Sequence, residues 1–158
     1  MVTNSGIAER WAGLASAADD ERVGKMREVL DDVLALGDAE RTSTIESMVQ
    51  SEYALDEAQL RPFTISRLRA WLQVADGNMD GATSLARGYD AAFDKLGASL
   101  AMRRSTMVQT VARHDLTPEE VAGLFNLIPS IVRQVPKSTA PTRVYEKPEQ
   151  KKPFWKFW

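Results

Sequence analysis

Hydrophobic residues recur every three or four positions from residue 5 to about residue 135, which is the spacing of one face of an α-helix. Strict alternation of apolar and polar residues, the mark of a strand, is absent, and Ala, Leu, Glu, Arg and Met dominate. The clearest stripe comprises Val23, Met26, Leu30, Val33 and Leu34. The pattern predicts an all-α fold, a compact bundle of five or six helices.

Capping and breaking residues set the expected helix boundaries. We predict helices over residues 5–17, 19–36, 38–53, 62–75, 80–114 and from 117 onward. Pro62 suits the first turn of the fourth helix, which would bury Ile65, Leu68, Leu72 and Ala75. Gly97 could break the long fifth helix. Thr117-Pro118-Glu119-Glu120 has the hydroxyl, proline and glutamate of a capping box and marks the last helix start.

The composition changes after Val135. Four of the seven prolines lie beyond this point, among Lys, Ser, Thr, Glu and Gln. We therefore divide the chain into a helical domain (residues 1–135), an extended Pro-rich linker (136–150) and a cationic aromatic peptide (151–158, KKPFWKFW). The domain carries 14 basic and 20 acidic residues, whereas residues 136–158 carry six basic and two acidic ones. A basic segment joined to an acidic domain indicates an anionic or acidic contact.

The cationic aromatic peptide is the most informative stretch, because exposed aromatic surface promotes association. Three interpretations stay open. Trp and Phe rings favour a membrane–water boundary and lysines favour anionic head groups. Aromatic anchors also carry much of the energy of protein interfaces. Alternatively, the rings cover the chain's own helices. The attachment residues would be Lys151, Lys152, Phe154, Trp155, Lys156, Phe157 and Trp158.

The stretch DGNMDG resembles the start of an EF-hand calcium loop. Asp76, Asn78 and Asp80 supply the alternating oxygen ligands, and Gly81 allows the sharp turn. The EF-hand family has a bidentate glutamate six residues after that glycine, where this chain has Arg87. We therefore expect no metal site, and we interpret the stretch as a helix–helix turn with Asp80 as the N-cap.

Residues 116–135 resemble a helix-turn-helix DNA-binding unit. Ala122 is the small residue at the helix crossing, and Asn126 stands at the turn, where the left-handed backbone is required. The resemblance implies that Ser130, Arg133 and Gln134 face base edges. Pro136 shortens the second helix, and an acidic domain is atypical of a DNA reader, so nucleic acid is the alternative partner only.

The sequence gives little support for a catalytic or transition-metal site. The chain has no cysteine and one histidine, His114, which suits a helix C-terminus through its interaction with the helix dipole. Arg103 and Arg104 are expected at a solvated helix edge, and Trp11 and Trp71 in the core or a groove. No signal peptide or membrane-spanning run is expected. We therefore expect a cytoplasmic protein, peripheral to a membrane if the peptide meets lipid.

These observations predict a non-enzymatic adaptor or assembly protein without a cofactor. It would attach to a protein partner, a larger assembly or an anionic membrane surface through residues 151–158. The alternative is a DNA-binding regulator that acts through residues 116–135.

Overall fold

The computed structural model describes residues 4–127, and these residues form an all-α bundle without strands. Its seven α-helices and one 3₁₀-helix are α1 (Asn4–Gly13), η1 (Leu14–Ser16), α2 (Asp19–Leu34), α3 (Asp38–Glu52), α4 (Glu57–Gly77), α5 (Met79–Leu96), α6 (Ala98–His114) and α7 (Pro118–Leu127). The all-α prediction is confirmed, and the helix count exceeds the expected five or six. Along these residues, no helix combines the length and apolarity needed to cross a bilayer.

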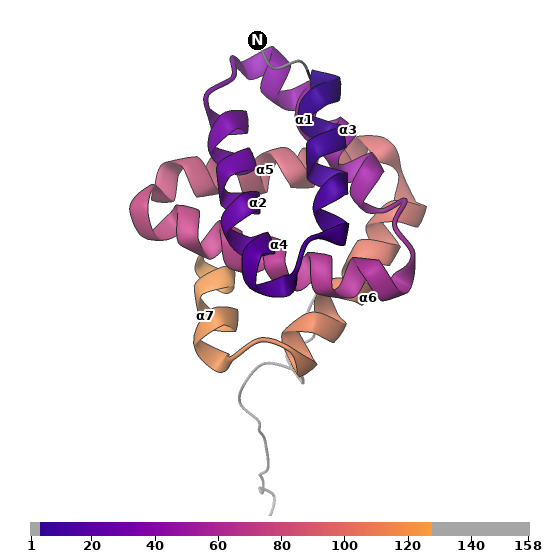
Figure 1. Ribbon diagram of the computed structural model, residues 1–158, viewed down its shortest axis with the longest axis vertical. Helices are drawn as coiled ribbons and strands as arrows, with labels where there is room; N and C mark the ends of the chain where they lie inside the picture. The colour runs from indigo at the N-terminus through magenta and orange to yellow at the C-terminus, as the bar shows by residue number, and fades with distance from the viewer. Residues whose placement is uncertain (1–3, 128–158) are drawn as a thin grey trace, which may run out of the picture.

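The helices pack in two crossing groups (Figure 1). α1 lies against α3, and α2 lies against α4, while α5 packs on both α3 and α4. In the view of Figure 1, α1 and α2 run vertically, and α4 and α5 form a hairpin that crosses them. α7 lies below this hairpin on the same side as α2, and α6 lies on the other side. α4 therefore forms the central element, with contacts to α2, α5, α6 and α7.

Aromatic side chains fill the core where these helices meet. Trp11, Phe63, Trp71 and Tyr89 are all fully buried. Trp11 meets Phe63 edge to face at 5.4 Å between ring centroids, and Trp71 meets Tyr89 in the same way at 4.8 Å. Such pairs add about 0.5–1.5 kcal/mol beyond the burial of their surface. The expectation that Trp11 and Trp71 lie in the core or a groove is resolved in favour of the core.

One predicted boundary is wrong, and another that the sequence left open is now settled. α4 begins at Glu57, not near Pro62, because Asp56 caps it by accepting a hydrogen bond from the Gln59 amide at 2.8 Å. Pro62 lies inside the helix. The predicted helix over residues 80–114 is interrupted at Gly97, the break that the sequence allowed, because Gly97 has φ 112° and ends α5. A residue with positive φ cannot continue a right-handed helix.

The two arginines expected at a solvated edge are instead engaged in packing. Arg104 is buried, donates to Asp90 at 2.8 Å and lies over the Phe93 ring at 4.6 Å. Arg103 donates to the backbone carbonyls of Tyr53 and Leu55. Both therefore tie α6 to the rest of the bundle, which an amphipathic pattern does not reveal because a charged residue counts as a polar position.

Candidate binding groove

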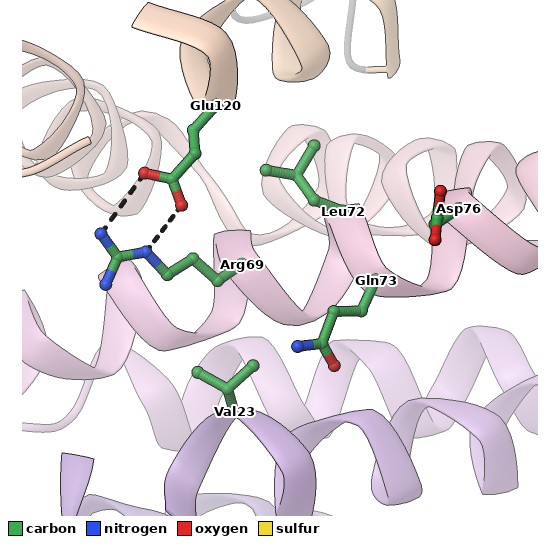
Figure 2. Close-up of a pocket in the computed structure, with 6 residues that line it drawn as sticks. All are labelled: Val23, Arg69, Leu72, Gln73, Asp76 and Glu120. Carbon is green, nitrogen blue, oxygen red and sulfur yellow. Dashed lines mark hydrogen bonds and ion pairs between the residues drawn. The ribbon is translucent and has the colours of Figure 1, made fainter. Parts of the chain in front are cut away.

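A surface groove runs along α4, with α2 on one side and α7 on the other (Figure 2). Its wider part has a volume of about 480 Å³, and a narrower part of about 140 Å³ continues from it. Val23 and Arg69 line both parts. We call this feature the α2–α4 groove, with the lining residues Asp19, Val23, Pro62, Ile65, Ser66, Arg69, Leu72, Gln73, Asp76 and Glu120.

Helical periodicity explains why α4 supplies most of the lining. Its groove residues, from Pro62 to Asp76, follow one another at steps of three positions or one, so that each lies three or four positions from another and all lie on one face. With a rise of about 1.5 Å per residue, this face is about 21 Å long. Val23, Ile65 and Leu72 are partly buried, so they form an apolar floor open to solvent. Of the predicted apolar face, Leu68 is therefore buried in the core, whereas Ile65 and Leu72 line the groove.

α7 is held over this floor by a close contact and a charged pair. Gly123 packs so tightly that a Cβ atom there would lie 3.0 Å from Leu72 Cδ2. Arg69 donates from Nε to Glu120 Oε2 at 2.8 Å and from Nη2 to Glu120 Oε1 at 3.3 Å (Figure 2). Arg69 Nη2 also reaches the Asp115 carbonyl at 3.3 Å, which fixes the start of α7.

Glu120 has a second role as part of the predicted capping box, which is confirmed. The Thr117 amide donates to Glu120 Oε1 at 2.9 Å, and the Glu120 amide donates to Thr117 Oγ1 at 3.1 Å. Partial burial alone would raise the pKa of the Glu120 carboxyl. The hydrogen bonds from Arg69 and Thr117 outweigh this effect and hold that pKa below its ordinary value. Glu120 therefore stays ionised at neutral pH.

The groove carries more negative than positive charge. Asp19, Asp76 and Glu120 line it, against the single cation Arg69. Arg69 is matched by Glu120, and Asp19 pairs with the buried Arg22 at 2.7 Å. The Asp76 side chain is exposed and makes no hydrogen bond or ion pair with any residue from 4 to 127. The arrangement can therefore accept an elongated ligand that combines apolar groups with positive charge.

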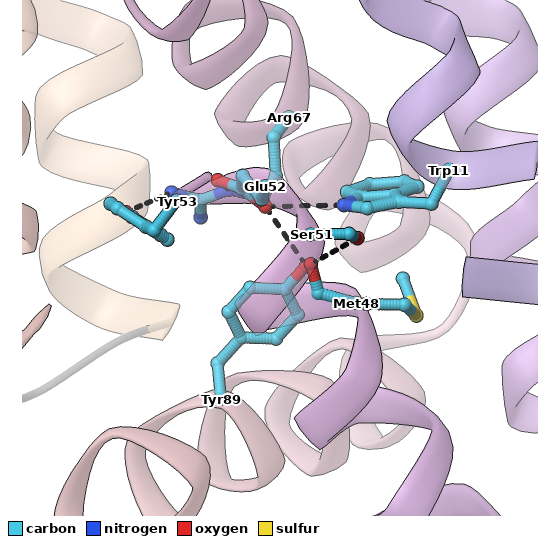
Figure 3. A network of polar contacts seen from close by, with 7 residues as sticks. All are labelled: Trp11, Met48, Ser51, Glu52, Tyr53, Arg67 and Tyr89. Atoms are coloured by element: carbon cyan, nitrogen blue, oxygen red, sulfur yellow. Dashed lines mark hydrogen bonds and ion pairs between the residues drawn. The ribbon is translucent and has the colours of Figure 1, made fainter. Parts of the chain in front are cut away.

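A second polar cluster lies inside the bundle and centres on Glu52 and Arg67 (Figure 3). Both side chains are 0% exposed, and Arg67 Nε donates to Glu52 Oε2 at 2.8 Å. Glu52 Oε1 also accepts hydrogen bonds from Trp11 Nε1 at 3.1 Å and from the Tyr89 hydroxyl at 3.3 Å. The guanidinium lies 4.7 Å from the centre of the Trp71 ring. Such burial leaves no path for a substrate without unfolding of the surrounding helices.

The titration of this cluster is shifted by its burial. Burial raises the pKa of Tyr53 to about 12, and Glu52 adds to this while Arg67 opposes it. Burial also raises the pKa of Tyr89, again with a contribution from Glu52. Burial alone would lower the pKa of Arg67, but Glu52 and the tyrosines raise it above its ordinary value. Both tyrosines therefore stay neutral and Arg67 stays charged at neutral pH, which suits a structural role.

The EF-hand-like stretch forms a junction between two helices. Asp76 lies in the last turn of α4, and Asn78 separates α4 from α5. The Asn78 side chain caps α5 by accepting from the Gly81 amide at 2.9 Å. The expectation that Asp80 is the N-cap is wrong, because Asp80 lies in the first turn of α5. Over residues 4–127, no group of three or more His, Cys, Asp or Glu side chains is placed to hold a metal ion.

The helix-turn-helix resemblance falls partly outside the described residues. Ser130, Arg133 and Gln134 are not described, whereas Asn126 lies within α7. The expected turn at Asn126 is therefore wrong, because the helix continues through Leu127. Ala122 is exposed, and Gly123 makes the close helix contact instead. His114 is the last residue of α6, as its preference for a helix C-terminus predicts.

The predicted attachment residues Lys151, Lys152, Phe154, Trp155, Lys156, Phe157 and Trp158, like the linker 136–150, lie outside the described residues. The α2–α4 groove was not predicted. Its signal in the sequence is a face of α4 that mixes polar and apolar residues, but its other walls come from α2 and α7, which a linear pattern does not connect. Comparison with protein-family models, curated proteins and solved structures finds no match for this chain.

Proposed function

We propose that this protein is a non-enzymatic helical adaptor or assembly protein that attaches to a partner complex or a membrane surface through residues 151–158. The observation that carries the proposal is the separation of charge and aromatic groups along the chain. Residues 4–127 contain 13 basic and 20 acidic residues, a net charge of −7. Residues 128–158 contain seven basic and two acidic residues, a net charge of +5.

The aromatic residues divide in a corresponding way. Six of the seven aromatic side chains in residues 4–127 are buried in the core, and the seventh, Phe125, is partly buried against it. The aromatic side chains of the described core therefore all come from residues 4–127. Four further aromatics and three lysines stand within residues 151–158. A peptide of this chemistry supports reversible attachment, since each lysine contributes about 1 kcal/mol near an anionic surface and aromatic anchors dominate protein interfaces.

Deletion of residues 151–158 tests the proposal. The full chain is expected to retain partners in a pull-down or to float with vesicles of 30% phosphatidylserine. The affinity of the deletion variant in the same assay is expected to be at least 10-fold lower, a loss of about 1.4 kcal/mol in binding free energy. Trp155→Ala/Trp158→Ala should weaken both kinds of attachment. Conversion of the three lysines to glutamate should abolish flotation. Equal binding by the full chain and the deletion variant in both assays would refute the proposal.

The alternative, a DNA-binding regulator acting through residues 116–135, makes the opposite prediction. Deletion of residues 151–158 would then leave function intact, and Arg133→Ala would weaken a salt-sensitive DNA complex. No feature of α7 favours this alternative over the attachment role, because Asn126, the residue expected at the turn, is helical.

A further inference from the structure

We propose that the α2–α4 groove binds residues 151–158 of the same chain, so that the attachment peptide has an intramolecular docking site. A regulatory role, in which the groove competes with an external surface for this peptide, rests on the proposed function, whereas the docking itself does not. The first argument is chemical. The groove offers an apolar floor of Val23, Ile65 and Leu72 beside Asp76, a carboxylate without an ion-pair partner among residues 4–127. The peptide offers rings and lysines in one short stretch.

Individual contacts can be assigned by charge. Asp76, exposed and without a partner among residues 4–127, is the free anion for a lysine. The Arg69 side chain is 41% exposed while its Nε and Nη2 atoms are held by Glu120. A guanidinium fixed in this way presents a flat cationic face on which a Trp ring can stack. Trp155 and Trp158 supply such rings three positions apart.

Length supports the same occupant. An extended chain spans about 3.3 Å per residue, so eight residues cover about 26 Å, close to the groove length of about 21 Å given by α4. The intervening residues 128–150 span up to about 75 Å when extended, which allows the peptide to return from the end of α7. α7 itself borders the groove through Glu120. Tethering of this kind raises the effective concentration of the peptide to the millimolar range.

A consequence for regulation follows. The groove and an external surface would compete for the same rings and lysines. The docked peptide would therefore be unavailable for attachment until an acidic or lipid surface that binds it more tightly draws it out of the groove. Asp76→Lys should then increase external attachment, since it weakens the competing site without changing the peptide.

The absence of cysteine allows a direct test in the full chain. A nitroxide is attached to Gln150→Cys, next to the peptide, and paramagnetic broadening of ¹⁵N-labelled backbone amides is measured. We expect broadening at residues 19–23 of α2, 69–76 of α4 and 119–123 of α7. Broadening that is absent, or is centred on another face such as that around Met102 on α6, overturns the proposal.

Matched charge reversals make the test specific. Asp76→Lys should remove most of the broadening, whereas Asp94→Lys should leave it unchanged. Asp94 is exposed on α5, 17 residues beyond the end of α4, and like Asp76 it has no ion-pair partner among residues 4–127. Both variants are surface changes, so folding should be retained. Equal effects of the two reversals would contradict docking at the groove.

Mixing separates the same chain from a second copy. Spin-labelled protein at natural nitrogen abundance is mixed with ¹⁵N-labelled protein that carries no nitroxide. Intramolecular docking predicts no broadening of the ¹⁵N-labelled amides. Strong broadening would show docking between copies and would overturn the same-chain proposal. The attachment assays remain independent. Groove broadening without external attachment refutes only the proposed function, and attachment without groove broadening refutes only this inference.

Discussion

Glu52 and Arg67 form a fully buried ion pair inside a helical core. Removing two charges from water costs several kcal/mol, and their attraction repays this only when the remaining polar atoms are hydrogen-bonded. Glu52 meets that condition through Trp11, Tyr89 and Arg67. Arg67 meets it in part, because its Nη1 atom has no hydrogen-bond partner among the described residues. The cluster therefore depends on both charges being present.

Glu52→Gln is expected to destabilise the fold by about 3–5 kcal/mol, because it leaves the Arg67 charge buried without its partner. The double variant Glu52→Gln/Arg67→Met should cost less than the sum of the two single changes, because it removes both charges. Urea unfolding followed by circular dichroism measures each value. Glu46→Gln, which removes the exposed pair with Lys95, is the control and should cost less than about 1 kcal/mol. A similar small cost for Glu52→Gln would show that the buried pair is not needed.

Residue-scale patterns predicted burial for apolar side chains and missed the buried charges. Ile45, Met48, Val49 and Tyr53 are buried as their spacing indicates. Arg22, Glu52, Arg67 and Arg104 are buried as well. A charged residue reads as a solvent position unless its partner is known. The partner of Arg67 lies 15 positions away on another helix, so periodicity within one helix could not reveal it.

At the scale of single helices, two glycines contrast in their surroundings. Gly24 lies in the middle of α2, with nothing within 4 Å of the position of a Cβ atom. Gly88 lies in the middle of α5, where a Cβ atom would approach Ile45 Cδ1 of α3 to 2.6 Å. Gly24 therefore lowers helix stability without a packing reason, whereas Gly88 permits α3 and α5 to lie close together.

Gly24→Ala should stabilise the fold by about 1 kcal/mol, the usual helix advantage of alanine. Gly88→Ala has the same intrinsic gain, but overpacking against Ile45 costs about 1–3 kcal/mol, so the net effect should be neutral to destabilising. Thermal unfolding compares the two variants. Ile45→Val removes the Cδ1 atom, so Gly88→Ala should be stabilising in that background. An equal increase in thermal stability for both substitutions in the wild-type background would show that Ile45 moves aside without cost.

Helix ends were predictable where the sequence carries a cap. The Thr117 capping box and the break at Gly97 are both local signals. The start of α4 was misplaced because Pro62 is a stronger sequence signal than Asp56, although Asp56 makes the capping hydrogen bond. The α2–α4 groove could not be predicted, since it requires the packing of three helices. Local sequence signals thus predict helix ends, whereas the groove depends on how α2, α4 and α7 pack together.

At the scale of the whole molecule, an acidic bundle is covalently joined to a basic segment. Opposite charges of −7 and +5 attract each other over a distance set by ionic strength. The Debye length falls from about 30 Å at 0.01 M salt to about 3 Å at 1 M. Docking at the α2–α4 groove should therefore weaken as salt rises, although ring contacts with Val23 and Leu72 are not screened.

The hydrodynamic radius of the full chain is therefore expected to increase between 0.01 M and 1 M salt as the peptide leaves the groove, measured by dynamic light scattering at constant protein concentration. Lys151→Glu/Lys152→Glu/Lys156→Glu should give the larger radius at every salt concentration, because the reversed peptide is repelled by Asp76. Lys137→Glu/Arg143→Glu/Lys147→Glu changes the net charge equally and leaves the peptide intact, so more of the increase with salt should remain. Identical behaviour of the two triple variants would mean that net charge alone, and not docking of residues 151–158, sets the dimensions of the chain.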